Sequence, residues 1–98
     1  MTVDQILAEV RVLLIDIIGE EYAIGLDIGM ATSFEADLQL ESIEFVKLAT
    51  MLNDRYGTRV DFVAFLAAKE LEEIIQMTVG ELVTYIADRL TLVDSIDG

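Results

Sequence analysis

Residues 40–57 read LESIEFVKLATMLNDRYG, and this stretch decides the fold class. Its apolar residues recur at i, i+3, i+4, i+7 and i+11, at Phe45, Leu48, Ala49, Leu52 and Tyr56. This spacing is typical of an α-helix with one face on a core, and a glycine just after the last periodic residue is typical of a helix end. We therefore predict a helix over 42–56 that ends at Gly57.

Helical periodicity also appears near both ends of the chain. The first stripe consists of Val3, Ile6, Leu7, Val10, Leu13, Leu14 and Ile17. With Thr2 as the N-cap and Gly19 as the stop, it predicts a helix over 3–18. Near the other end, Thr78 followed by Glu81 has the spacing of a capping box. The helix that it opens has an apolar stripe at Val79, Leu82, Val83, Ile86 and Leu90, and residues 92–98 are expected to form a flexible tail.

Two intervening segments are less regular. Residues 19–40 contain three glycines and a Thr-Ser pair, yet apolar side chains are scattered through them at Tyr22, Ile24, Leu26, Ile28, Phe34, Leu38 and Leu40. We expect a long loop lying against the core. Residues 62–75 predict a shorter or broken helix. The sequence thus predicts one all-α domain over 1–98, a four-helix bundle with three long helices, one short helix and a long loop between the first two.

Composition limits the classes of function. The 98 residues include 19 acidic and 6 basic side chains, a net charge of −13, with neither Cys nor His. Such a charge repels nucleic acid and anionic lipid and favours partners with basic patches. Disulfides and thiolate metal sites are excluded, and the commonest general base is missing. No apolar run approaches about 18 residues, so no membrane span is expected. The start lacks a basic n-region, so we expect no secretory signal and a cytosolic location.

Metal binding and catalysis have little support in the residue pattern. The stretches that begin at Asp27 and Asp54 lack the central Gly and the final Glu of an EF-hand loop. Ser42 and Lys47 are five residues apart on one helix and do not share a face well. We therefore expect neither a calcium site of this type nor autonomous catalysis.

Ser42 is the remaining candidate, because it lies where the loop becomes a helix. It is either an N-cap, for which Ser is favoured, or a modified residue, since a helix N-terminus favours a nearby phosphate. Glu44 cannot form a capping box with Ser42, because Phe45 occupies the third position onward. Ile43 and Val46 fall outside the buried stripe, so we expect them to be partly exposed and suited to partner docking. The residue pattern leaves both interpretations open.

The stretch SFEADLQLESIEFV, residues 33–46, resembles the signature of the acyl carrier protein family. The positions that match in order and spacing are Phe34, Asp37, Leu38, Ser42 and Ile43. The likeness extends through the end of the 42–56 helix to residues 78–82, so it covers nearly the whole chain. It implies a helical bundle that is not an enzyme. It also implies that a phosphopantetheinyl transferase attaches 4′-phosphopantetheine from coenzyme A to Ser42.

The departures from the family pattern are specific. Gln39 and Glu41 stand where the family has Gly and Asp, and Lys47 stands where members often carry an acid. Residues 60–77 are longer than in typical carriers of fatty-acid synthesis. The Gly-Gly pair of peptidyl carriers is missing. The resemblance is therefore closer to acyl carriers of polyketide or other specialised pathways.

The resemblance also implies how such a carrier works. Acyl groups ride as thioesters on the thiol of the arm and visit acyl-transferring or acyl-modifying enzymes with basic patches. The expected docking residues are Glu41, Ile43, Glu44, Val46 and Asp54. Leu48, Leu52, Phe65 and Ile74 are either walls of an acyl-chain cleft or plain core. The chain is expected to be a monomer. The alternatives are a small acidic helical adaptor without a prosthetic group and a carrier fold that has lost modification.

Overall fold

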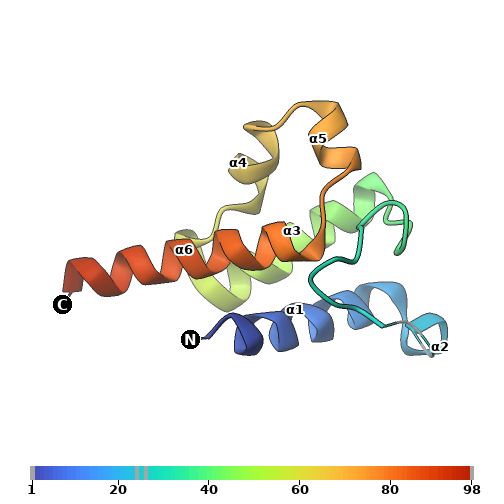
Figure 1. The fold of residues 1–98 in the computed structure, drawn as a ribbon, viewed down its shortest axis with the longest axis horizontal. Helices are drawn as coiled ribbons and strands as arrows, with labels where there is room; N and C mark the ends of the chain where they lie inside the picture. The colour runs from blue at the N-terminus through green and yellow to red at the C-terminus, as the bar shows by residue number, and fades with distance from the viewer. Residues whose placement is uncertain (1, 24, 26, 98) are drawn as a thin grey trace.

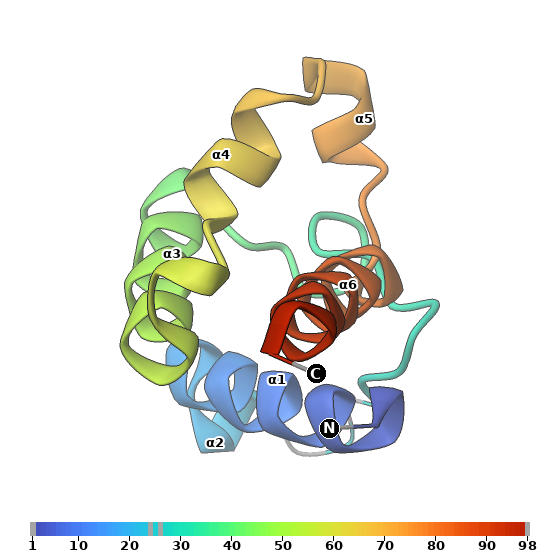
Figure 2. The same cartoon turned by 90° about the vertical axis from the view of Figure 1, so that its left-hand side faces the viewer.

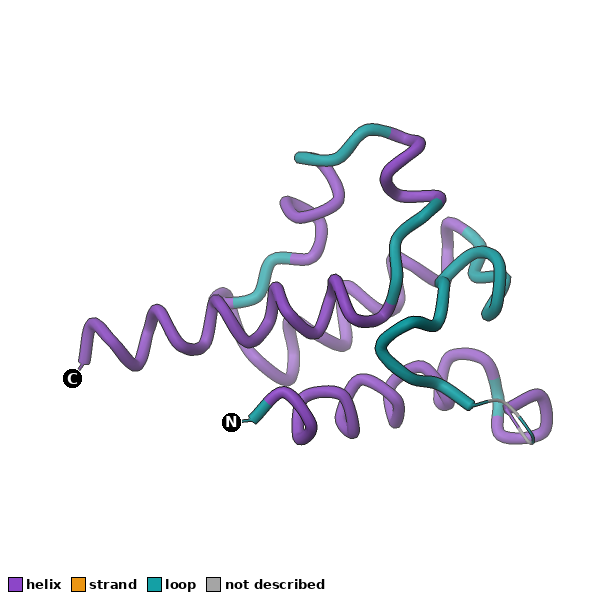
Figure 3. The backbone as a smooth tube through the Cα atoms, viewed as in Figure 1, coloured by secondary structure: helices purple, strands orange, loops and turns teal. Residues whose placement is uncertain are grey.

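Three long helices form the body of the molecule in the computed structural model (Figure 1), which describes residues 2–23, 25 and 27–97, with side chains other than that of Ala23 as far as Leu90. The elements in order are α1 (Val3–Ile18), α2 (Glu20–Ala23), α3 (Ser42–Tyr56), a 3-10 turn (Gly57–Arg59), α4 (Phe62–Ala67), α5 (Leu71–Ile75) and α6 (Val79–Asp97). The described chain contains no strand, and its loops join the helices directly (Figure 3). The predicted all-α bundle is confirmed.

The core lies where α1, α3 and α6 meet. Helix α1 packs against both α3 and α6, and α4 and α5 form an arch on the opposite side of these two helices (Figure 2). The fully buried side chains of the three long helices include Ile6, Val10, Leu14, Leu48, Leu52, Leu82, Val83 and Ile86. Each belongs to a predicted apolar stripe. Burying one such side chain contributes about 1.5–3 kcal/mol, so the stripes hold the bundle together.

The predicted bounds of the first two long helices are confirmed. Thr2 caps α1, because its hydroxyl accepts from the Gln5 N–H at 3.2 Å and the Gln5 side chain accepts from the Thr2 N–H at 2.9 Å. Gly19 ends α1 with a φ of 101°. Helix α6 continues to Asp97, through residues 92–97 that the sequence suggested as part of a tail, and the flexibility of that tail stays a prediction. After Gly80, neither Gly nor Pro occurs in the sequence before Gly98, which lies outside the described residues.

The long loop packs on the core as predicted, with differences in detail. Its buried side chains are Ile28, Phe34, Leu38 and Leu40. Tyr22 was expected against the core but is 76% exposed. The short helix α2 turns it outward, and its ring lies close to Gly19. Ile24 and Leu26 lie outside the described residues.

The loop also covers the start of α6. The Val79 N–H donates to the Thr32 carbonyl, and the Gly80 N–H donates to the Met30 carbonyl, both at 2.8 Å. Gly80 is buried, and a Cβ added there would lie 2.7 Å from the Met30 carbonyl oxygen. The close approach of these two backbones therefore requires glycine at this position.

The segment predicted as a broken helix consists of two short helices. Asp61 caps α4, because its side chain accepts from the Ala64 N–H at 3.0 Å. After α4 the chain starts again at Glu70, whose N–H donates to the Glu73 carboxylate at 3.1 Å. Two separate helix starts explain why the helical pattern over 62–75 is discontinuous. None of the helices in the described part combines the length and apolarity needed to span a bilayer.

Candidate functional site

The start of α3 places Ser42 at the first helical position. Glu41 occupies the N-cap, and its N–H donates to the Glu44 carboxylate at 2.9 Å. The Phe45 N–H donates to the Glu41 carbonyl at 3.1 Å, so the helical ladder begins at Glu41. The interpretation of Ser42 as an N-cap is therefore wrong. The physical reason is the spacing of the two acids. Glu44 is three residues after Glu41, which is the position from which a carboxylate accepts a hydrogen bond from the N-cap amide, so the helix starts after Glu41 and not after Ser42.

The hydroxyl of Ser42 is exposed, and among the described residues it makes no hydrogen bond. Ser33 differs, because its hydroxyl accepts from the Ala36 N–H at 3.1 Å and thereby stabilises a turn. The first amide groups of a helix have no intrahelical acceptor and form the positive end of the helix dipole. An anion bound at Ser42 would therefore lie in a favourable field.

A tight turn leads the chain to Ser42. Gln39 has a φ of 53°, the left-handed region, and among the described residues it is the only non-glycine residue there. Its N–H donates to the Glu35 carbonyl at 3.0 Å, which closes a turn of the type that ends many helices. Leu38 and Leu40 on either side are buried and anchor the turn. A left-handed backbone favours glycine, so Gln39 stands at a position where glycine would fit without strain.

Four of the five predicted docking residues lie together at the start of α3. Ile43 is 62% exposed and Val46 is 64% exposed, as predicted for residues outside the buried stripe. Glu41 is exposed and Glu44 is partly exposed. Asp54 is exposed at the far end of the helix, about 16 Å along the axis from Ile43 by the helical rise. The structure thus forms a small apolar surface edged by acids at Ser42 and leaves Asp54 apart from it.

The candidate walls of an acyl-chain cleft divide into two groups. Leu48 and Leu52 have no exposed surface, so in this conformation they are core residues. Phe65 and Ile74 are partly buried and belong to α4 and α5. The structure therefore does not bring the four side chains together around an open cleft.

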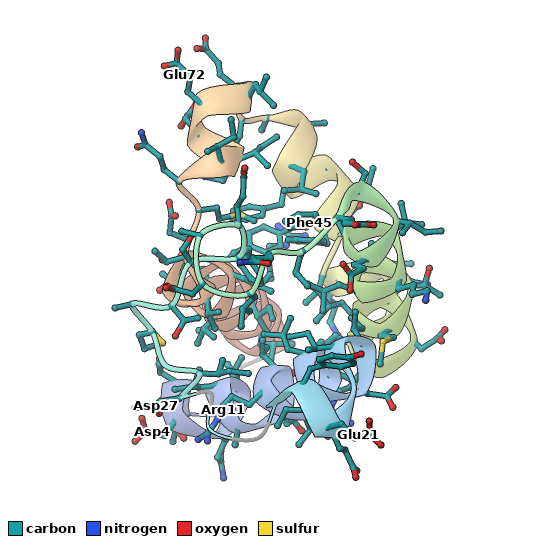
Figure 4. All side chains as sticks on the ribbon, turned by 90° about the vertical axis from the view of Figure 1, so that its right-hand side faces the viewer. Asp4, Arg11, Glu21, Asp27, Phe45 and Glu72 are labelled. Atoms are coloured by element: carbon teal, nitrogen blue, oxygen red, sulfur yellow. The ribbon has the colours of Figure 1, made fainter. Side chains whose placement is uncertain are left out.

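A chain of aromatic rings connects the site to the far side of the bundle, and residue patterns alone did not predict it. The rings of Phe34 and Phe45 have centroids 5.8 Å apart, and Phe45 lies 6.3 Å from Phe62. The chain continues to Phe65 at 6.1 Å and to Tyr85 at 4.5 Å. Figure 4 shows Phe45 directed from α3 toward the interior beneath the arch. Stacked and tilted pairs of this kind stabilise the packing of α3, α4 and α6.

The far end of α3 is fastened to α1 by polar contacts. Glu9 accepts from the Arg55 guanidinium at 2.7 Å and from the Tyr56 hydroxyl at 2.5 Å. The hydrogen bond from Arg55, together with that from Tyr56, lowers the pKa of Glu9 although desolvation opposes the change. Burial and the Glu9 carboxylate raise the pKa of Tyr56. Sequence reasoning predicted Tyr56 as a core residue but missed this contact, because its partners are 47 positions apart.

The described residues show no second reactive group arranged around Ser42. Lys47 is exposed one turn further along α3, and the described acids form no cluster of three that could hold a metal ion. What the geometry offers is one accessible hydroxyl on a helix start with an acidic and apolar border. Such a hydroxyl is suited to modification by another protein.

A family model described as the phosphopantetheine attachment site matches residues 12–78, more than half of the chain. The chain belongs to this family of acyl carrier proteins. No match was found among curated proteins or among solved structures. The family binds 4′-phosphopantetheine covalently, and its carrier domains are not themselves catalytic. Carriers work with the transferase that attaches the group and with enzymes that handle acyl groups.

The residues of this carrier fit the group. The matched range contains two serines, Ser33 and Ser42, and the whole of α3. A phosphodiester needs a serine oxygen that is accessible and has room beside it for an anion. The helix start at Ser42 provides both, whereas the Ser33 hydroxyl is engaged in its turn.

Proposed function

We propose that this protein carries acyl groups on 4′-phosphopantetheine attached to Ser42 Oγ. The observation that supports this assignment is the difference between the two serines of the matched range. Ser42 is exposed at an open helix start with no hydrogen bond among the described residues, and Ser33 is held by Ala36. An accessible and unengaged hydroxyl is the better acceptor for a transferase.

The chain's own part in attachment is to present the hydroxyl and to stabilise the phosphate. In the transferase reaction a bond forms between Ser42 Oγ and the phosphorus atom of coenzyme A that carries the pantetheine. The bond to the adenosine bisphosphate leaving group breaks, and the hydroxyl proton passes to a base on the transferase. The free amides at the start of α3 would stabilise the negative charge of a phosphodiester on Ser42. When bound, the group supplies the thiol that holds acyl groups as thioesters, which this cysteine-free chain cannot supply itself.

The surface beside Ser42 is the proposed docking site for partner enzymes. Ile43 and Val46 supply its apolar part, and Glu41 and Glu44 face basic residues of the partner. Asp54, exposed near the far end of the same helix, is a separate contact that only a partner covering most of α3 reaches. An interface this small is weak and transient, which suits a carrier that must dissociate between steps.

The pathway proposal rests on the sequence resemblance. We infer a carrier for polyketide, fatty-acid-like or other specialised biosynthesis, acting as a monomer in the cytosol. The departures at Gln39 and Glu41 and the longer 60–77 segment support a specialised member over a general fatty-acid carrier.

Intact mass measurement tests the assignment. The protein is incubated with coenzyme A and a broad-specificity phosphopantetheinyl transferase, and it should gain the mass of one phosphopantetheine. Ser42→Ala should gain none, and Ser33→Ala should gain the same mass as the unaltered protein. If the unaltered protein gains no mass, the acidic adaptor without a prosthetic group becomes the better description.

A second measurement tests the docking surface. Val46→Asp should slow modification because it places a charge in the apolar part of the interface. The helical signal in far-UV circular dichroism should be unchanged, since Val46 is 64% exposed. Loss of that signal would show that Val46 supports the fold instead.

A further inference from the structure

A second apolar stripe runs along an exposed face of α1. Its members are Ala8, Val12 and Ile15, at the spacing i, i+4 and i+7 of one helix face. Val12 is 64% exposed, Ala8 is exposed and Ile15 is partly buried, so this stripe is distinct from the buried stripe of the same helix. Valine also has a lower helix propensity than leucine or alanine. Neither core packing nor helix formation therefore explains Val12.

This stripe borders a depression between α1 and α3. Val12 and Ile15 line the depression from α1, Met51 lines it from α3, and its volume is about 360 Å³. Met51 is partly buried. A methionine side chain is flexible and adapts to the shape of an apolar group that packs against it. The depression thus offers an apolar floor on which a side chain of another protein can pack.

The charges at the edge of this depression are negative. Asp16 and Glu20 line it, both are exposed, and among the described residues neither makes an ion pair. The last turn of α1 contains no basic residue. The carbonyl groups at the end of a helix form the negative end of its dipole, so they add to the field of the two carboxylates. A positively charged group is therefore the complement of this edge.

The same charges disfavour a second copy of this chain as the occupant. A symmetric contact would bring Asp16 and Glu20 of two copies together, and each copy has a net charge of −13. A basic segment is instead attracted from a distance and can pair with both acids. An amphipathic helix with aliphatic side chains on one face and Lys or Arg beside them fits a groove of this kind.

The depression faces away from Ser42. Met51 is nine residues after Ser42 on α3. By helical geometry this places Met51 about 14 Å along the axis from Ser42 and about half a turn around it. Figure 2 shows α1, which forms the other wall of the depression, on the opposite side of the bundle from the arch. A protein bound in the depression therefore leaves Ser42 accessible.

We propose that the depression between α1 and α3 binds a basic amphipathic segment of a partner protein while Ser42 stays accessible. An aliphatic side chain of the segment packs among Val12, Ile15 and Met51, and its Lys or Arg side chains pair with Asp16 and Glu20. Binding of this segment goes beyond the proposed function, and only the simultaneous use of Ser42 rests on it. The carrier then remains attached to one protein while other enzymes act at Ser42.

A synthetic amphipathic helix of leucine and lysine is the probe for this surface. It is added to protein labelled in its methionine methyl groups, and the Met51 methyl signal should shift as the peptide binds. The methyl signal of Met30, which is 37% exposed on the long loop, should not shift. A peptide with glutamate in place of lysine should shift neither signal, because Asp16 and Glu20 repel it. If the leucine–lysine peptide leaves the Met51 signal in place, the inference is overturned.

Variants of the depression separate its apolar and charged parts. Val12→Ser should raise the Kd of the leucine–lysine peptide about threefold, and Asp16→Asn/Glu20→Gln should raise it about tenfold. The effect of the charge variant should shrink as salt is raised. The thermal midpoints of both variants should stay close to that of the unaltered protein, since the three side chains are exposed.

Two matched controls make the same chemical changes elsewhere. Val63→Ser replaces a valine that is also 64% exposed, but on α4. Glu72→Gln/Glu73→Gln removes two exposed charges from α5. Each should leave the Kd of the peptide within about twofold, because the net charge that attracts the peptide from a distance is largely kept. Equal losses of affinity in the controls and in the depression variants would show that the peptide has no defined site, and would overturn the inference.

The remaining measurements concern Ser42 and self-association. Protein saturated with the peptide should still gain phosphopantetheine at the rate of the free protein, and a block of modification would show that the two surfaces are not independent. A dimer in light scattering that Val12→Ser dissociates would assign the depression to a second copy, and the inference would be wrong. If the protein without peptide is not modified, the proposed function fails, whereas the Met51 signal still decides whether the segment binds.

Discussion

The starts of α3 and α6 have the same local chemistry and different surroundings. At α3 the Glu41 N–H donates to the Glu44 carboxylate, and at α6 the Thr78 N–H donates to the Glu81 carboxylate, both at 2.9 Å. The start of α6 is covered by the long loop, which accepts hydrogen bonds from its first amides. The start of α3 faces solvent. The comparison teaches that one helix start serves folding and the other remains available for a ligand or a partner.

The largest expected effect concerns the covered start. Gly80→Ala should lower the free energy of unfolding by about 2 kcal/mol, because the new Cβ would lie 2.7 Å from the Met30 carbonyl oxygen and the loop must move. Urea denaturation measures this change. Gly29→Ala is the matched control, since a Cβ there meets nothing within 4 Å. Helix propensity alone favours Ala over Gly. A Gly80→Ala variant more stable than the unaltered protein would therefore show that the loop is not closely packed on α6.

The next effect concerns the far end of α3, which is hydrogen-bonded to α1, whereas the start of α3 faces solvent. Glu9→Gln should lower the free energy of unfolding at neutral pH by about 1 kcal/mol, because the charge-assisted hydrogen bonds to Arg55 and Tyr56 weaken. The pKa of Glu9 is lower in the folded protein than its ordinary value of 4.5. The stability from this carboxylate is therefore present above that value and is lost as the pH falls through the folded pKa.

Urea denaturation at several acidic pH values measures this dependence. Glu9→Gln should show a flatter decline in stability below about pH 4.5 than the unaltered protein. Asp54→Asn, an exposed neighbour on α3, should leave the decline unchanged. Equal declines for the unaltered protein and Glu9→Gln would contradict a stabilising role for the contact between α1 and α3.

The smallest effects compare the two helix starts directly. Thr78→Ala should lose about 1 kcal/mol, because the Thr78 hydroxyl accepts from the Glu81 N–H at 3.3 Å. Ser42→Ala should change stability by less than about 0.5 kcal/mol, since its hydroxyl makes no hydrogen bond among the described residues. Thermal or urea denaturation of the two variants in parallel checks this. An equal loss in both would show that the Ser42 hydroxyl supports the fold.

Much of the fold could be predicted because it depends on periodic burial. The stripes of α1 and α3 have a strict helical spacing, and their bounds agree with the structure. The apolar residues of the long loop were also predicted to pack inward, which Phe34 and Leu38 do. The N-cap at the start of α3 was not predicted, because serine is intrinsically favoured there and the pairing of Glu41 with Glu44 decides the register instead.

The rest of the site depends on contacts that a local pattern does not contain. The bond between Glu9 and Tyr56 joins residues 47 positions apart. The exposed face of α5 follows from the arch standing away from the bundle, since the spacing of Leu71 and Ile75 is equally compatible with burial. The exposure of Ile43 and Val46 could be predicted because both lie outside a stripe that is already complete.

The turn that Gln39 closes has a consequence for the thermodynamics of association. Leu38 and Leu40 are buried on either side of it, so the core restricts the segment leading to Ser42 in the free protein. A partner therefore spends little of its interaction energy on ordering this segment. A contact with only a few side chains can then have a longer lifetime. The conformational cost of this preorganisation belongs to folding, because Gln39 adopts a left-handed backbone conformation in the folded protein.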